Sequence, residues 1–290
     1  MKGIGRARSY GAVSILNAIS TGKGGALSID LWTSSKVTLH NGTGAISGFS
    51  ATHPDESTKL VVTTVERILD QYGYRDKVNG EVITSSNIPP AVGLKSSSAA
   101  ANATALATVS ALGIDPNDDI LLGIVTDAGV EAGVSITGAF DDSFASYHGG
   151  AVLTDNNLRR VVKEIFIPPK LRVIILVPPR KTYTGSLDGS KFAAINRLAE
   201  MAYREACSEH VWDALTLNGL VYSSVLGEDP QPALAALEAG ALGAGLSGKG
   251  PAIAAIAQED KVDNVKKAWE KYPGQVLLCS PNSKKAMIEE

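Results

Sequence analysis

The segment over residues 89–109 constrains the fold of this chain more than any other part of its sequence. It reads Pro-Pro-Ala-Val-Gly-Leu-Lys-Ser-Ser-Ser and then continues into a run dominated by alanine. The paired prolines exclude a helix interior or a central strand at its start, whereas alanine is the strongest helix former. A serine before such a run is a favoured N-cap. We therefore expect a glycine-containing loop that leads directly into the N-terminus of an alanine-rich helix.

The expected start of this helix has the chemistry of a phosphate site. The first turn of a helix leaves backbone N–H groups without intrahelical partners, and the positive end of the helix dipole lies there. Both features favour a phosphate, and a serine hydroxyl at that place can also reach a metal ion. The alternative is an ordinary capped helix, which needs only one serine, whereas three consecutive serines follow Lys95. We therefore favour phosphate binding.

The rest of the chain predicts a mixed α+β protein. Short β-type runs separated by glycine turns fill its start, with a hairpin turn at residues 40–42, and residues 57–72 have the apolar spacing of an amphipathic helix. Beyond a turn at 155–157, strands and helices alternate, so we expect an N-terminal domain, 1–157, and a C-terminal domain, 158–290. The expected strands are 13–19, 26–31, 32–39, 81–86, 151–154, 161–167, 173–177, 252–257 and 275–279, and the further expected helices are 118–133, 191–208, 210–225, 231–239 and 261–271.

The composition bounds the class of protein. A chain of 290 residues with 44% hydrophobic and 20% charged residues can bury a large core. The net charge of −3 gives no basic field for nucleic acid or an anionic membrane. No apolar run approaches the roughly 20 residues that span a bilayer, and the N-terminus lacks the apolar core of a signal peptide. Cys207 and Cys279 form no CxxC pair, which fits a reducing compartment. We expect a cytoplasmic protein.

A second glycine-rich segment covers residues 243–250. It contains GxGxxG and nearly matches the P-loop pattern, but Gly250 stands where a serine or threonine should bind magnesium. Both motifs need a strand, a loop and then a helix, whereas here an expected helix precedes the segment and an expected strand follows it. We therefore exclude a Rossmann fold and a P-loop enzyme. Two interpretations of this segment remain. It is either a loop whose glycines let backbone or a ligand approach closely, or a plain tight connection between two elements.

A third segment carries adjacent carboxylates in apolar, glycine-flanked surroundings. Asp141 and Asp142 follow a Thr-Gly-Ala-Phe string, and Glu131 precedes them. A carboxylate placed there can orient or deprotonate a hydroxyl, and Glu131 can help to hold Mg²⁺ through oxygen. The alternative is an Asx turn or a helix cap made by one aspartate. The four histidines have no metal spacing, and no GxSxG motif occurs.

Taken together, these segments resemble the GHMP kinases, the family of galactokinase, homoserine kinase and mevalonate kinase. The family's second motif is matched by Pro89, Gly93, Leu94, Ser96 and Ser97, with Ser98 and Ala99 following; its third motif is similar to 246–250, and its first to 14–24. Within the family, the sequence most resembles the archaeal-type shikimate kinases. Three stretches carry that likeness, namely Lys95 with the third serine, the string 137–142, and 16–19.

The resemblance implies a two-domain α+β GHMP kinase fold, with an N-terminal half like domain 2 of ribosomal protein S5 and a ferredoxin-like C-terminal half. ATP and the acceptor would bind in the cleft between the halves. The implied reaction is ATP- and Mg²⁺-dependent phosphorylation of the 3-hydroxyl of shikimate. The alternatives are another small-alcohol kinase of the family, acting on homoserine or mevalonate, and a non-catalytic ligand sensor. A small-molecule substrate is the only partner implied, and the oligomeric state stays open.

The resemblance also implies roles for individual residues. The triphosphate would be bound by Pro89, Gly93, Leu94, Lys95, Ser96, Ser97, Ser98 and Ala99, and Mg²⁺ by Ser97 and Glu131. Asp142, or alternatively Asp141, would act on the acceptor hydroxyl. The acceptor side would include Asn17, Ser247, Gly248, Lys249 and Gly250, with Arg180 as a partner for the carboxylate. Some members carry a lysine in the first motif; Tyr10 stands there, so that role is vacant or taken by Arg6, Arg8, Lys23 or Lys95.

Overall fold

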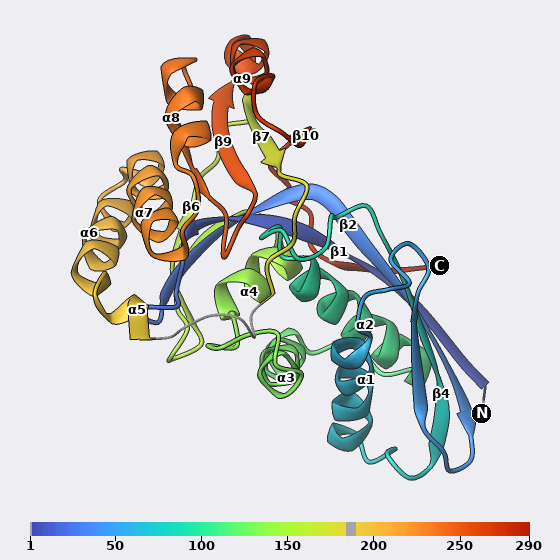
Figure 1. Cartoon of the computed structure of the whole chain (residues 1–290). Helices are drawn as coiled ribbons and strands as arrows, with labels where there is room; N and C mark the ends of the chain where they lie inside the picture. Colours follow the sequence, from blue (N-terminus) through green and yellow to red (C-terminus); the bar gives the residue numbers. More distant parts are fainter. Residues whose placement is uncertain (1, 184–189) are drawn as a thin grey trace.

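Two β-sheets organise the chain, and the first is built on two long neighbouring strands (Figure 1). The structure is a computed structural model that describes residues 2–183 and 190–290. β1 (Lys2–Leu16) and β2 (Lys23–Asn41) pair antiparallel. The sheet has the order β11-β1-β2-β4-β3, with β5 on β2 and β6 on β5. Its other strands are β3 (Ile46–Ser50), β4 (Val78–Ser86), β5 (Ala151–Asp155), β6 (Arg160–Ile165) and β11 (Met287–Glu289).

The expected hairpin at residues 40–42 is wrong. In the described sheet, β3 pairs in parallel with β4 and does not pair with β2. The reason is that both edges of β2 are already occupied there, by β1 on one side and by β4 on the other. A parallel pair needs a crossover connection, which is supplied by helix α1 (Lys59–Gln71).

Four helices cover one face of the first sheet (Figure 1). The alanine-rich helix α2 packs on β1 and β2, and the other three surround it. Each lies where the sequence predicted a helix, except for the short α4, which begins directly before the two aspartates. Besides α1, these helices are α2 (Ser96–Leu112), α3 (Asp118–Glu131) and α4 (Phe140–His148).

The second sheet has the order β10-β7-β9-β8 and is antiparallel throughout. Its central strand β7 alternates between two cores: Val173 and Ile175 face the core shared with the first sheet, and Ile174 and Leu176 face the helices. The elements of this half are β7 (Leu171–Val177), β8 (Gly243–Leu246), β9 (Ile253–Gln258), β10 (Gln275–Cys279), α5 (Ser190–Ala193), α6 (Asn196–Cys207), α7 (Val211–Leu226), α8 (Gln231–Glu238) and α9 (Val262–Trp269).

The expected α+β class is confirmed by these two mixed layers. The first sheet also takes up β6 and β11, which both lie beyond residue 157 in the sequence. The division into 1–157 and 158–290 therefore stays a prediction, and the chain end returns to pair with β1 near Ala7. A three-residue edge strand of this kind has too short a pattern to be recognised from sequence.

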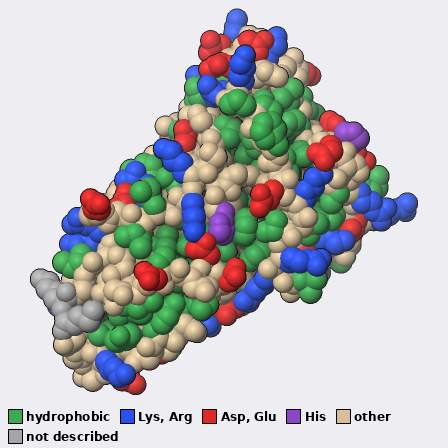
Figure 2. Space-filling model, turned by 180° about the vertical axis from the view of Figure 1, so that it is seen from behind, with side chains coloured by type: hydrophobic (Ala, Val, Ile, Leu, Met, Phe, Trp, Pro, Cys, Tyr) green, Lys and Arg blue, Asp and Glu red, His purple; other side chains and the backbone are tan. Residues whose placement is uncertain are grey.

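The surface matches the near-balanced charge of the chain. Figure 2 shows lysine and arginine side chains interspersed with aspartate and glutamate over the visible face. Among the described helices, none combines the length and the apolar character that crossing a bilayer would require. The expected cytoplasmic location, and the expected lack of nucleic-acid and membrane partners, stay predictions.

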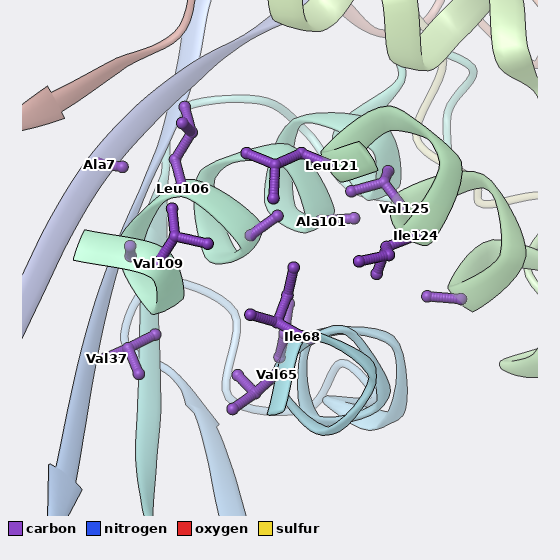
Figure 3. Close-up of a cluster of buried hydrophobic side chains, with 14 of the residues drawn as sticks. Ala7, Val37, Val65, Ile68, Ala101, Leu106, Val109, Leu121, Ile124 and Val125 are labelled. Atoms are coloured by element: carbon purple, nitrogen blue, oxygen red, sulfur yellow. The ribbon is translucent and has the colours of Figure 1, made fainter. Parts of the chain in front are cut away.

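The core beneath the first sheet fixes the position of α2. Side chains from α1 and α3 meet the apolar side of α2, and residues of β1 and β2 close the cluster from the sheet side (Figure 3). Because the alanine-rich helix packs against α1, α3 and the sheet, its N-terminus is held at a fixed place. The labelled members are Ala7, Val37, Val65, Ile68, Ala101, Leu106, Val109, Leu121, Ile124 and Val125.

Candidate active site

A cleft with a volume of about 380 Å³ brings together most of the residues singled out from the sequence. Its walls come from the loop before α2, the start of α4, the end of β1 and the loop between β8 and β9, which are far apart in the sequence. The predicted site residues that line it are Asn17, Gly93, Lys95, Ser96, Ser97, Ser98, Asp141, Asp142, Gly248, Lys249 and Gly250.

The N-terminus of α2 opens into this cleft without a side-chain cap. The helix begins at Ser96, and the residue before it, Lys95, has a left-handed backbone with φ of 61° and makes no side-chain capping bond. The expected serine cap is therefore wrong, because the serines form the first turn instead of preceding it. The backbone N–H of Ala99 is bonded to the carbonyl of Lys95. The earlier N–H groups and the helix dipole are available to an anion.

Two further members of the predicted phosphate loop lie in the core. Leu94 and Ala99 are buried among apolar side chains that include Val13 and Ile29. Their side chains anchor the loop from below, so they can support a ligand only through the backbone. Pro89 stands at the start of the loop, outside the residues that line the cleft.

One buried serine joins the end of β1 to two loops beneath the cleft. The Ser247 hydroxyl donates to the Gly93 carbonyl at 2.8 Å and accepts from the Ser14 N–H at 3.0 Å. The Ser14 hydroxyl accepts in turn from the N–H of Gly248 at 3.0 Å, and the amide of Asn17 donates to the Gly248 carbonyl at 2.9 Å. Ser247 is fully buried and does not line the cleft, so its side chain holds these segments together.

Close approach explains Gly93 in the predicted phosphate loop. A Cβ on Gly93 would lie 2.0 Å from the Ser247 carbonyl oxygen, and its φ of 93° disfavours other residues. In the glycine-rich segment 243–250, Gly243 and Gly245 belong to β8 and pack against backbone of α7. The segment thus joins two antiparallel strands, β8 and β9. This order agrees with the exclusion of a P-loop and of a Rossmann fold.

The two aspartates have different surroundings, which separates their chemistry. Asp141 is buried, and its carboxylate accepts from the Asn156 amide at 2.8 Å. Its other oxygen faces Gly24, where a Cβ would lie 2.3 Å away. Burial, and then the charge of Asp142, raises the pKa of Asp141 to about 7. Asp141 is therefore packed under the site, whereas its neighbour faces charged groups in the cleft.

Asp142 forms an ion pair with Lys95. The Nζ of Lys95 lies 3.0 Å from Oδ1 of Asp142, and both side chains are largely buried. That oxygen has no well-directed hydrogen bond within the described part of the chain. Asp142 is thus a carboxylate that lines the cleft and is held beside a cation.

A second lysine enters the cleft from the C-terminal half. Lys249, between β8 and β9, donates to the Val134 carbonyl at 3.5 Å, across the cleft from its own strand pair. Burial, and then the charge of Lys95, lowers the pKa of Lys249 to about 8, with Asp142 acting in the opposite direction. Two lysines, Lys95 and Lys249, and the Asp142 carboxylate therefore line the same cleft.

The structure does not bring Glu131 or Arg180 into the cleft. Glu131 ends α3 on its outer side, where it pairs with Arg67 at 2.7 Å in a separate polar depression. Arg180 is half exposed and forms hydrogen bonds with both carboxylate oxygens of Glu228. The roles predicted for both residues stay untested predictions, and sequence spacing did not determine which way either side chain faces. Among the described residues, no group of three His, Cys, Asp or Glu side chains could hold a metal ion.

Sequence reasoning missed one wall of the cleft. It is formed by the loop between β3 and α1 together with the segment after β7. Glu56 accepts from the Nζ of Lys181 at 2.6 Å and from the Tyr183 hydroxyl at 3.1 Å, and the Thr182 N–H donates to the Ala91 carbonyl at 2.8 Å. A loop rich in hydroxyl residues before α1 was the only signal in the sequence. Residues in the missed wall are Ser50, His53, Glu56, Ser57, Thr58, Thr182 and Tyr183.

Comparison of the sequence with models of known protein families assigns the chain to one family. Residues 59–150 match the model of the GHMP kinases N terminal domain, and residues 192–274 match the GHMP kinases C terminal model. The chain therefore belongs to the GHMP kinase family, as its three motifs predicted, and it is a kinase.

Curated relatives narrow the class. The shikimate kinase of Methanothermobacter thermautotrophicus is 40% identical over 98% of this chain and 97% of its own length. The shikimate kinase of Methanosarcina acetivorans is 40% identical over 98% and 96%. A solved homoserine kinase from Cytophaga hutchinsonii superimposes with a TM-score of 0.75 at 20% identity, covering 100% of this chain and 98% of that one. That last similarity shows the fold alone.

Proposed function

We propose that this chain is a shikimate kinase that transfers the γ-phosphate of ATP to the 3-hydroxyl of shikimate. One observation carries the proposal: the uncapped N-terminus of α2, with its three serines, opens into the same cleft as Asp142 and the loop at 248–250. The cleft thus combines an anion site with a carboxylate that can act on a hydroxyl. Shikimate is chosen as acceptor because the relatives with 40% identity are named shikimate kinases.

The α2 terminus and the serine hydroxyls fit a magnesium nucleotide. Mg²⁺ keeps several waters and takes most of its remaining ligands from the phosphates, so it needs few protein oxygens. Ser97 is exposed in the cleft at the first turn of α2 and would supply one of them. Glu131 lies elsewhere and has no part in the proposal. When bound, Mg²⁺ supplies positive charge between the phosphates during transfer.

The residues of the chain act by positioning and by charge. The backbone N–H groups of Ser96, Ser97 and Ser98 bind the phosphates, and the acceptor hydroxyl donates its hydrogen bond to Asp142. The hydroxyl oxygen forms its bond to the γ-phosphorus as the bond to the β-phosphate oxygen breaks, and the proton passes to Asp142. Lys249 replaces Arg180 as the candidate partner of the acceptor carboxylate, because it is the C-terminal-half cation that lines the cleft.

The test is ADP release by the purified protein with ATP and Mg²⁺. We expect turnover with shikimate, and none with homoserine, mevalonate or galactose at equal concentration. Turnover with another of these alcohols would change the assigned substrate but leave the proposed reaction class in place. ATP binding without turnover of any acceptor would favour a non-catalytic ligand sensor.

The Asp142→Asn variant tests the proposed chemistry. We expect the kcat for shikimate to fall by at least about 100-fold, since an amide cannot take the proton, while the Kd of ATP changes little. Calorimetric titration with ATP provides the binding measurement, and a thermal unfolding curve shows whether the variant is folded. Wild-type turnover in this variant would overturn the role of Asp142.

A further inference from the structure

Lys95 has a strained backbone at the entrance to α2. Its φ of 61° is in the left-handed region, which is unfavourable for a residue with a side chain. Such strain persists where the surrounding structure fixes it and is concentrated at functional sites. A glycine would adopt this conformation without that cost. The chain therefore keeps a lysine side chain here at a conformational expense.

The side chain of Lys95 is directed inward. It is only 8% exposed, and its Nζ lies 3.0 Å from Asp142 Oδ1. An ammonium group removed from water is strongly destabilised unless it is paired, so this contact stabilises the buried position of both groups. Lysine surface pairs in this chain are different, as in Lys285 with Asp118, where the lysine side chain is 51% exposed.

Gly248 lies directly against the end of the Lys95 side chain. Its φ of 58° is in the left-handed region that glycine favours, and a Cβ there would lie 3.0 Å from the Lys95 Nζ. The loop between β8 and β9 thus passes close to the ammonium group and helps to enclose it.

The other cations considered for the role of the lysine in the family's first motif lie outside the cleft. Arg8 pairs with Glu289 and stacks on Trp32, and Lys23 pairs with Glu200. Arg6 does not line the cleft either. Tyr10 cannot supply a charge of this sign. Lys95 alone of these candidates is both in the cleft and in contact with Asp142.

We infer that Lys95 is the positioning residue for Asp142. The inference rests on the proposed function and adds a residue to it. Lys95 holds Oδ1 of Asp142, which leaves the second carboxylate oxygen for the acceptor hydroxyl. Lys95 acts through Asp142 and not by binding the nucleotide.

The Lys95→Met variant separates these two roles. We expect the kcat to fall by at least about 30-fold, with the KM values for ATP and for shikimate changing by less than about threefold. In an Asp142→Asn background, the same substitution should cost little more, because its partner is already lost. Lys285→Met is the matched control, since it breaks a lysine–aspartate pair outside the cleft and should keep the wild-type kcat.

Several outcomes would overturn the inference. A raised KM for ATP at unchanged kcat would make Lys95 a phosphate ligand, and multiplicative losses in the double variant would show that it acts independently of Asp142. If Lys95→Met does not fold, Lys95→Gln takes its place; it should lower the kcat in the same way, and an unchanged kcat would contradict the inference. Failure of the wild-type protein to use shikimate would instead reject the substrate, and the same comparisons would then be made with the alcohol that it does phosphorylate.

Discussion

At the scale of single residues, burial gives chemically similar side chains different roles. Asp141 and Asp142 are adjacent, yet one is packed against Asn156 and the other is paired with Lys95. The same holds for the lysines, since the pKa of Lys249 is lowered to about 8 by burial and by the nearby Lys95. Each of these differences gives a measurable dependence on pH.

Lys249 predicts a pH dependence of acceptor binding. In its proposed role, only the protonated form of Lys249 attracts the acceptor carboxylate, and with a pKa of about 8 that form is lost as the pH rises above 8. We expect the KM for shikimate to be flat below pH 7.5 and to rise by up to tenfold per pH unit above about 8. Steady-state kinetics between pH 6.5 and 9.5 measure this. Lys249→Arg keeps its charge and should remove the rise; an identical rise in that variant would contradict the assignment.

Asp141 predicts a pH dependence of stability. Its folded-state pKa of about 7 lies above the ordinary value of 3.8, so between these values the folded protein binds the extra proton. The native state is therefore progressively destabilised as the pH rises from about 4 to 7. Asp141→Asn cannot ionise, so its Tm relative to wild type should increase from pH 5 to pH 8. A Tm difference that does not vary with pH would show that the carboxyl is ionised throughout.

At the scale of elements, the contact between β1 and α2 determines where the N-terminus of α2 lies. Gly3 and Gly5 on β1 face the helix backbone, where Cβ atoms would lie 1.9 and 2.0 Å from the carbonyl oxygens of Ala111 and Ala107. The small residues on both sides let the helix and the strand approach closely. This packing explains why an alanine-rich helix, which buries little side-chain area per residue, is nevertheless well fixed.

A single methyl group at this contact should be costly. Gly5→Ala has no space, so the helix must shift, and we expect the free energy of unfolding to fall by about 2 kcal/mol or more. Gly123→Ala in α3 is the matched control, since nothing lies within 4 Å of its Cβ and alanine is the better helix former. It should stabilise the protein by up to about 1 kcal/mol. Urea denaturation measures both, and equal effects would refute the close-contact argument.

At the scale of the whole molecule, the halves are in contact both beneath the cleft and at one of its walls. Beneath the cleft lies the Ser14–Ser247–Gly93 set. At the wall, Glu56 receives hydrogen bonds from Lys181 and Tyr183. The set beneath the cleft is largely buried and the contacts at the wall are partly exposed, so the wall is the weaker of the two.

Loss of the Glu56 contacts should loosen the cleft. We expect Glu56→Ala to raise the KM for ATP about two- to fivefold, which corresponds to the strength of a partly exposed ion pair, with less effect on kcat. Glu259→Ala breaks the ion pair with Arg172 inside the C-terminal half and should change neither constant. Initial-rate kinetics at varied ATP provide the comparison. An unchanged KM for ATP would show that this wall does not contact the nucleotide.

Local sequence patterns were sufficient to predict several elements of this protein and its family. Helix propensity and the paired prolines located α2 and its loop, periodicity located α1, and the three motifs predicted the family that the comparisons confirm. These features were predictable because each depends on neighbours a few residues away. The exclusion of a P-loop also needed only the order of the elements around residues 243–250.

Only the tertiary structure decided the rest. It paired β3 with β4, placed Lys95 directly before the first residue of α2, and buried Ser247 between the end of β1 and two loops. It also turned Glu131 away from the cleft and brought Lys95 to Asp142. The physical reason is common to all five: strand partners, helix faces and ion pairs are selected by packing between segments distant in the sequence, and no local pattern records which segments will meet.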